Sequence, residues 1–173
     1  MGDTKWDLGK LNTGERAALR RAAGTVNKKA DMAALRALYT ACGYCDPNVE
    51  EYWFPAMCMD ALWRDMEGIA VKPMDECLKS LLTGDEKTTA SLKHRIEMLL
   101  ETPWNEDGFL LGKLLNLVKI LKSRTYMKPD FQALADDLRR WNHPDRYIQR
   151  KWLRTLYNAK PNDKEEEETQ NVD

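Results

Sequence analysis

The apolar residues of this chain are mostly good helix formers, and this restricts its fold more than any other feature. The sequence contains 22 Leu, 16 Ala and 8 Met, against only 5 Val and 4 Ile. Leucine, alanine and methionine favour helices, whereas the β-branched residues that favour strands are scarce. We therefore expect an all-α protein, folded as a compact bundle of about eight helices. A chain of 173 residues is long enough to bury a sizeable core.

Capping residues and prolines give the expected helix boundaries. Asn12 and Asp130 precede stretches of apolar residues at helical spacing, as N-capping residues do. Asp46-Pro47 places proline in the first turn of another helix, and Pro144 is expected to begin the last one. Pro55 lies within a helical stretch, which it is expected to kink or divide.

Thr83-Gly84-Asp85 is the clearest internal break in the helical pattern. It predicts two helical sub-bundles, of about residues 1–82 and 88–159, within one helical domain of residues 1–159. Residues 160–173 are acidic and nearly lack apolar side chains, so we expect a disordered tail.

The formal net charge of −1 is an average over unequal segments. Residues 1–40 hold 8 Lys or Arg against 4 Asp or Glu, and residues 77–159 hold 15 against 10. Residues 41–76 hold 2 against 8, and residues 160–173 hold 2 against 6. This pattern favours a phosphate-binding face and a separate acidic face. Ordinary solvated surface charge is the alternative.

The sequence predicts a soluble, cytoplasmic protein. No stretch approaches the ~18 apolar residues of a membrane span, and Met1–Lys10 lacks the apolar core of a signal peptide. Cys42 and Cys45 have zinc-ligand spacing, but no second pair of this kind completes a site, which favours structural thiols over zinc. No Walker loop, G-x-S-x-G, H-E-x-x-H or G-x-G-x-x-G motif is present. We therefore expect no enzymatic activity, no cofactor and no metal.

Arginines at helical spacing near residue 150 are the most informative functional signal. Arg146, Arg150 and Arg154 fall within about 80° of each other on a helix, and tyrosines border the same side. Guanidinium groups beside aromatic rings suit a phosphate backbone and unstacked bases. Three further clusters bring the predicted nucleic-acid-binding residues to Arg16, Arg20, Arg21, Lys93, Arg95, Arg139, Arg140, Arg146, Arg150 and Arg154.

His143-Pro144-Asp145 is also the signature tripeptide of J-domain co-chaperones. A J-domain requires an earlier tyrosine-rich helix and a loop that extends beyond the tripeptide. Here Pro144 is expected to start the next helix, so the co-chaperone interpretation is disfavoured.

Several motifs, in their order along the chain, resemble one family. They are Gly-x-Arg-Ala-x-Leu-Arg-Arg at residues 14–21, Ser91–Ile96, a leucine-rich helix, Asp137–Trp141 and Trp-x-Arg-x-x-Tyr at residues 152–157. Together they resemble CasB, the small subunit of the type I-E CRISPR Cascade complex. The resemblance covers most of residues 6–157 and is loose over residues 41–76.

The resemblance implies an all-helical protein present in two copies in an RNA-guided antiviral surveillance complex, without nuclease activity. The implied partners are the backbone and large subunits of Cascade, a second copy of this chain and the target DNA strands, with crRNA as a further candidate. The implied role is to stabilise the R-loop through basic faces, while guide–target pairing supplies sequence specificity. The alternative is a purely structural adaptor, whose basic faces meet acidic surfaces of partner subunits.

Overall fold

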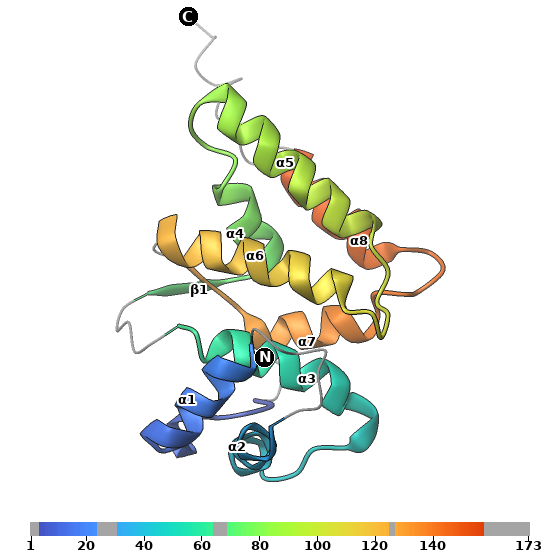
Figure 1. Ribbon diagram of the computed structural model, residues 1–173. Helices are drawn as coiled ribbons and strands as arrows, with labels where there is room; N and C mark the ends of the chain where they lie inside the picture. The colour runs from blue at the N-terminus through green and yellow to red at the C-terminus, as the bar shows by residue number, and fades with distance from the viewer. Residues whose placement is uncertain (1–3, 24–30, 64–68, 125–126, 158–173) are drawn as a thin grey trace, which may run out of the picture.

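Helices dominate the computed structural model, which describes residues 4–23, 31–63, 69–124 and 127–157 (Figure 1). Within these residues the all-α expectation is confirmed, with eight α-helices and one short 3-10 helix. None of the described helices is long and apolar enough to cross a membrane. The helices are η1 Leu8–Lys10, α1 Thr13–Ala22, α2 Met32–Cys42, α3 Pro47–Asp60, α4 Met74–Ser80, α5 Glu86–Glu101, α6 Phe109–Arg124, α7 Phe131–Arg139 and α8 Tyr147–Tyr157.

Short polar side chains begin most of the helices. In α1 the Asn12 side chain accepts a hydrogen bond from the Glu15 backbone N–H, and the Glu15 carboxylate accepts one from the Asn12 N–H. This reciprocal capping box satisfies two backbone donors that a helix start otherwise leaves unpaired. At the start of four other α-helices an aspartate side chain accepts a hydrogen bond from a backbone N–H: Asp31, Asp46, Asp85 and Asp130.

Two of the expected effects of proline are absent: the division of a helix at Pro55 and the start of a helix at Pro144. Pro55 does not divide its helix, because α3 runs without interruption to Asp60; the second half of α3 is buried, and α3 packs against α7. Tertiary packing there outweighs the cost of a proline inside a helix. Pro144 does not begin the last helix but lies in a turn, and α8 starts at Tyr147. Arg146 has a φ of 50°, which interrupts helical backbone between these two residues.

The helices pack as two groups that alternate along the chain. Helices α1, α2, α3 and α7 lie on one side of Figure 1, and α4, α5, α6 and α8 lie on the other. The predicted division of the chain near residues 82–88 stays a prediction. Helices that precede it contact helices that follow it, since α3 packs against α7 and α4 packs against α8. The predicted tail, residues 160–173, lies outside the described residues.

A small parallel β-pair, which the sequence did not predict, links distant segments. Strands β1 (Ala70–Lys72) and β2 (Met127–Pro129) align Ala70 with Met127 and Lys72 with Pro129. Helices α4, α5 and α6 lie between these strands in sequence. The pair therefore fixes both ends of this three-helix segment next to each other.

A buried carboxylate fastens the first described residues to α3. Asp60 is 7% exposed and accepts a hydrogen bond of 2.8 Å from the Trp6 indole N–H. The Lys128 ammonium, on β2, lies 2.5 Å from its other oxygen. A buried charge is tolerated when it is paired in this way. Part of the acidic surplus of residues 41–76 is thus used inside the fold.

Candidate nucleic-acid interface

Helix α8 presents its arginines to solvent. Ile148 and Trp152 are buried, as the helical period predicts, whereas Arg150 and Arg154 are exposed. Among the described residues, neither arginine has a side-chain hydrogen bond or ion pair. Two cationic groups one turn apart are therefore available to an external anion.

Helix α8 is anchored to α7 and α4 by partly buried polar contacts. The Trp152 indole N–H donates to Asp137 on α7 at 3.1 Å, and the Lys151 ammonium lies 3.8 Å from the same carboxylate. Burial raises the pKa of Asp137 above its usual range, against the opposing effects of Lys151 and Trp152. The Thr155 hydroxyl donates to buried Asp75 of α4 at 2.6 Å. These contacts fix which face of α8 points outward.

Arg146 does not join the arginine row of α8. It precedes the helix, and its guanidinium donates to the Leu100 carbonyl at 2.7 Å and lies 3.7 Å from the Glu101 carboxylate. Both groups are in the last turn of α5. A cation there also interacts favourably with the negative end of the helix dipole. Arg146 thus connects the start of α8 to the end of α5.

Lys93 and Arg95, which the sequence predicted as one cluster, lie on different faces of α5. The Lys93 ammonium lies 4.3 Å from the centre of the Tyr157 ring, a cation–π contact with the end of α8. The Tyr157 hydroxyl donates to Glu97, and this hydrogen bond, with burial and the charge of Glu97, raises the tyrosine pKa to about 12. Arg95 is two residues from Lys93, about 200° around the helix, and does not share that face.

The cluster on α1 lines a cleft. Arg16 and Arg20 are half-buried, and the Arg16 Nε donates to the Leu8 carbonyl at 3.1 Å. The cleft has a volume of about 540 Å³ and is also lined by Thr13 and Trp63, among others. Arg21, by contrast, is exposed. The residues predicted as one basic cluster therefore differ in what surrounds them.

The last predicted cluster, at the end of α7, lies near an aromatic pair that sequence reasoning missed. Arg139 and Arg140 are exposed. Arg139 lies close enough to Tyr52 to influence its pKa, which burial raises on balance. The Tyr52 ring is 5.1 Å from that of Trp104, centre to centre. The two aromatic residues are far apart in sequence, in α3 and the α5–α6 connection, so no local pattern could indicate their contact.

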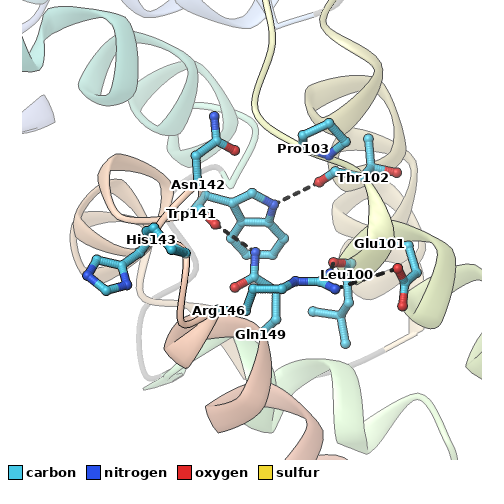
Figure 2. A pocket seen from close by; sticks show the side chains of 10 residues that line it. Leu100, Glu101, Thr102, Pro103, Trp141, Asn142, His143, Arg146 and Gln149 are labelled. Atoms are coloured by element: carbon cyan, nitrogen blue, oxygen red, sulfur yellow. Dashed lines mark hydrogen bonds and ion pairs between the residues drawn. The ribbon is translucent and has the colours of Figure 1, made fainter.

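A cavity of about 440 Å³ lies between the end of α5 and the α7–α8 turn (Figure 2). Trp141 and Gln149 reach into this region, and the Gln149 amide N–H donates to the Trp141 carbonyl at 2.7 Å. The full lining is Leu100, Glu101, Thr102, Pro103, Trp141, Asn142, His143, Pro144, Arg146 and Gln149.

Sequence reasoning did not identify Gln149 or the cavity. The only available signal was the His143-Pro144-Asp145 tripeptide, of which His143 and Pro144 line the cavity.

The Cys45 thiol donates to the Asp46 carbonyl at 3.8 Å, and burial is the main cause that raises the pKa of the neighbouring Cys42 to about 12. Protonated, partly buried thiols are poor nucleophiles and poor metal ligands. Within the described ranges, no three His, Cys, Asp or Glu side chains are grouped so that they could hold a metal ion.

Comparison with known proteins gives matches of sequence and of fold. The family model described as CRISPR-associated protein Cse2 matches residues 15–157. A CRISPR-associated protein Cse2 from Thermus thermophilus is 34% identical over 77 residues. That match covers 44% of this chain and 41% of the relative, so the chain spans less than half the length of this relative.

Solved structures resemble the whole fold. A CRISPR-associated protein of the Cse2 family and a protein described as CasB, both from Thermus thermophilus, each superpose with a TM-score of 0.63 at 25% identity. Each superposition covers 85% of this chain and 87% of the other. CasB from M. ruber superposes with a TM-score of 0.66 over 94% of this chain and 91% of that one. At 18% identity, the M. ruber likeness is one of fold alone.

Proposed function

This chain belongs to the CRISPR-associated Cse2 family, and from that premise we propose that it is the small subunit of a type I-E Cascade complex, acting in the cytoplasm. In this proposal it binds nucleic acid, has no enzymatic activity, and stabilises the R-loop formed on crRNA-guided target DNA, in antiviral defence. Its partners are the Cascade backbone and large subunits, a second copy of itself and the DNA strands, with crRNA as a further candidate.

The outward pair Arg150 and Arg154 is the observation that supports nucleic-acid binding best. Their guanidinium groups are exposed on a helix whose other side is fixed by Trp152, and exposed Tyr147 and Tyr157 lie at the two ends of that helix. A row of cations on one face of an anchored helix recognises a phosphate backbone without regard to sequence. Such a surface fits a role in which base pairing with the guide supplies the specificity.

The other predicted residues fall into two groups. One group already makes contacts within the fold, which lowers its availability: Arg16, Lys93 and Arg146. The second group has no side-chain hydrogen bond or ion pair within the described residues: Arg20, Arg21, Arg95, Arg139 and Arg140. We propose that the second group extends the path of the nucleic acid.

The first group favours an alternative function. Three of the ten predicted cations act as ties between helices, and such cations serve a structural adaptor that never touches nucleic acid. In that case Arg150 and Arg154 meet carboxylates of a neighbouring subunit. The two functions differ in whether the isolated protein binds DNA.

The test compares the full-length protein with the double variant Arg150→Ala/Arg154→Ala in titrations of DNA at several salt concentrations. If both arginines contact phosphates, the logarithmic dependence of affinity on salt becomes shallower by roughly 1.5. The loss of affinity should be equal for DNA of unrelated sequences, because phosphates carry no base information.

Lys119→Ala/Lys122→Ala is the matched control, because it removes the same charge from exposed positions on α6. If both double variants weaken DNA binding equally, the affinity responds to the net charge of the protein alone. Absence of DNA binding by the unmodified protein would favour the adaptor.

A further inference from the structure

The cavity between the end of α5 and the α7–α8 turn combines apolar walls with polar groups (Figure 2). Leu100, Pro103 and Trp141 contribute apolar surface, while Arg146 and Gln149 contribute a guanidinium and an amide. Its volume of about 440 Å³ falls within the range of roughly 300–1,000 Å³ that is usual for small-molecule sites. The composition suits a flat polar ring better than an alkyl chain.

The amide of Gln149 has an unused hydrogen-bond acceptor. The residue is 5% exposed, and its N–H group is committed to the Trp141 carbonyl. Its Oε1 is buried and has no hydrogen-bond donor among the described residues. Buried polar atoms of folded proteins are nearly always paired, because burial removes their hydration. An acceptor left in this state at a cavity wall points to a ligand with an N–H group.

Arg146 also lines this cavity, and its side chain is placed so that it can exchange its present contacts for a ligand. It is the one residue other than glycine with a positive φ among those described, and strained backbone of this kind is concentrated at ligand clamps. Its guanidinium donates to the Leu100 carbonyl at 2.7 Å, while its separation of 3.7 Å from the Glu101 carboxylate is too long for a strong ion pair, so a ligand oxygen has only the carbonyl contact to replace. Because Gln149 Oε1 is closed to solvent, a ligand must displace neighbouring groups to reach it, and Arg146 is placed to move.

The cavity also lies at the start of the arginine row on α8. Arg146 lines the cavity directly before α8 begins at Tyr147, and Arg150 and Arg154 follow on α8 one turn apart. A strand whose phosphates contact this row has its next nucleotide at the cavity. We propose that the cavity holds one unstacked nucleobase of a single strand bound along α8, an inference that rests on the proposed function.

The chemistry of a nucleobase matches the groups present. A thymine or guanine ring offers an N–H to Gln149 Oε1 and a carbonyl oxygen to the Arg146 guanidinium, whose plane can also stack on a base. In a duplex the same edges are occupied by base pairing. The site therefore distinguishes single strands from duplex DNA, which phosphate contacts alone do not.

The experiment titrates full-length protein with an oligothymidine strand and with an abasic strand of the same length. Both strands carry the same phosphates, and only one carries bases. A base in the cavity should make oligothymidine bind roughly tenfold more tightly than the abasic strand. Equal binding of the two strands would overturn the nucleobase site and leave the proposed function standing, whereas failure of both strands to bind would overturn both.

Gln149→Met removes the amide and keeps a similar side-chain length, so the affinity ratio of the two strands should fall to about one. Arg146→Gly is the second variant, since glycine accepts the positive φ at this position. This substitution removes one positive charge from the protein, which weakens the binding of both strands alike. A fall in the affinity ratio of the two strands therefore reports the loss of the base contact. Arg150→Ala is the control, which should weaken both strands equally and preserve the ratio. A ratio unchanged in both cavity variants would overturn the proposal.

Discussion

Helices α1 and α8 each carry two arginines one turn apart, yet they use them differently. On α1, Arg16 and Arg20 are half-buried, and Arg16 donates to the Leu8 carbonyl of the neighbouring η1. On α8, Arg150 and Arg154 are exposed and have no such carbonyl beside them. The difference arises from what packs next to each helix. Identical spacing therefore gives a structural tie in one place and an open cationic surface in the other.

The largest effect is expected from the inner side of α8. Trp152 is fully buried, lies 5.3 Å from the Trp141 ring and donates to Asp137. Trp152→Ala should lower the free energy of unfolding by about 3–5 kcal/mol, because it creates a cavity and removes a partly buried hydrogen bond. Chemical denaturation measures this change. The control is Leu153→Ala, at the exposed neighbouring position, which should cost less than about 1 kcal/mol; similar losses would mean that α8 is not anchored through its inner side.

The next largest effect is expected when single arginines of α1 and α8 are replaced and their effects on stability are compared. Arg16→Ala should lower the free energy of unfolding by about 1–2 kcal/mol, since it removes a charge-assisted hydrogen bond to the Leu8 carbonyl. Arg150→Ala should change stability by no more than about 0.5 kcal/mol. In DNA titrations the order should reverse, with Arg150→Ala the more damaging. If Arg16→Ala leaves stability unchanged, the contrast between α1 and α8 does not hold.

The smallest effect concerns the carboxylate beneath α8. Since the pKa of Asp137 in the folded protein is raised mainly by burial, the fold favours its protonated form. The stability that the protonated carboxyl contributes is fully present below the ordinary pKa of 3.8. It is lost as pH rises through the pKa of Asp137 in the folded protein. Asp137→Asn cannot ionise, so relative to the unmodified protein it should gain stability as pH rises through this window. Thermal melting from about pH 3 to about pH 6 measures the difference; a trend of the opposite sign would show that Lys151 dominates over burial.

Local signals in the sequence predicted the helices well, because helix starts depend on side chains only a few residues away. Asn12 and Asp130 cap helices as expected, and Pro47 lies in the first turn of α3 as expected. The course of the chain at Pro55 and Pro144 was not predictable in this way. Packing of α3 on α7 holds one proline inside a helix, and the contact of Arg146 with the last turn of α5 accompanies the delayed start of α8.

The candidate site was predictable only in part, for a related reason. Helical period correctly placed Ile148 and Trp152 inward and Arg150 and Arg154 outward. The engagement of Arg146 depends on Leu100, which is 46 residues away in sequence. The unpaired amide oxygen of Gln149 likewise results from packing between separate helices. Whether any of the ten predicted cations contacts nucleic acid stays a prediction.

The β1–β2 pair has a consequence for the order in which the chain folds. Because the strands are parallel, they meet only after the segment containing α4, α5 and α6 has left one strand and returned to the other. The entropy of closing so long a loop is paid before its hydrogen bonds form. Pairs of helices that are close in sequence, such as α1 with α2 and α5 with α6, face no such delay. The contacts between segments far apart in sequence, such as β1 with β2 and α3 with α7, should thus form last, and the rate of this final step should depend on how compact the intervening helices already are.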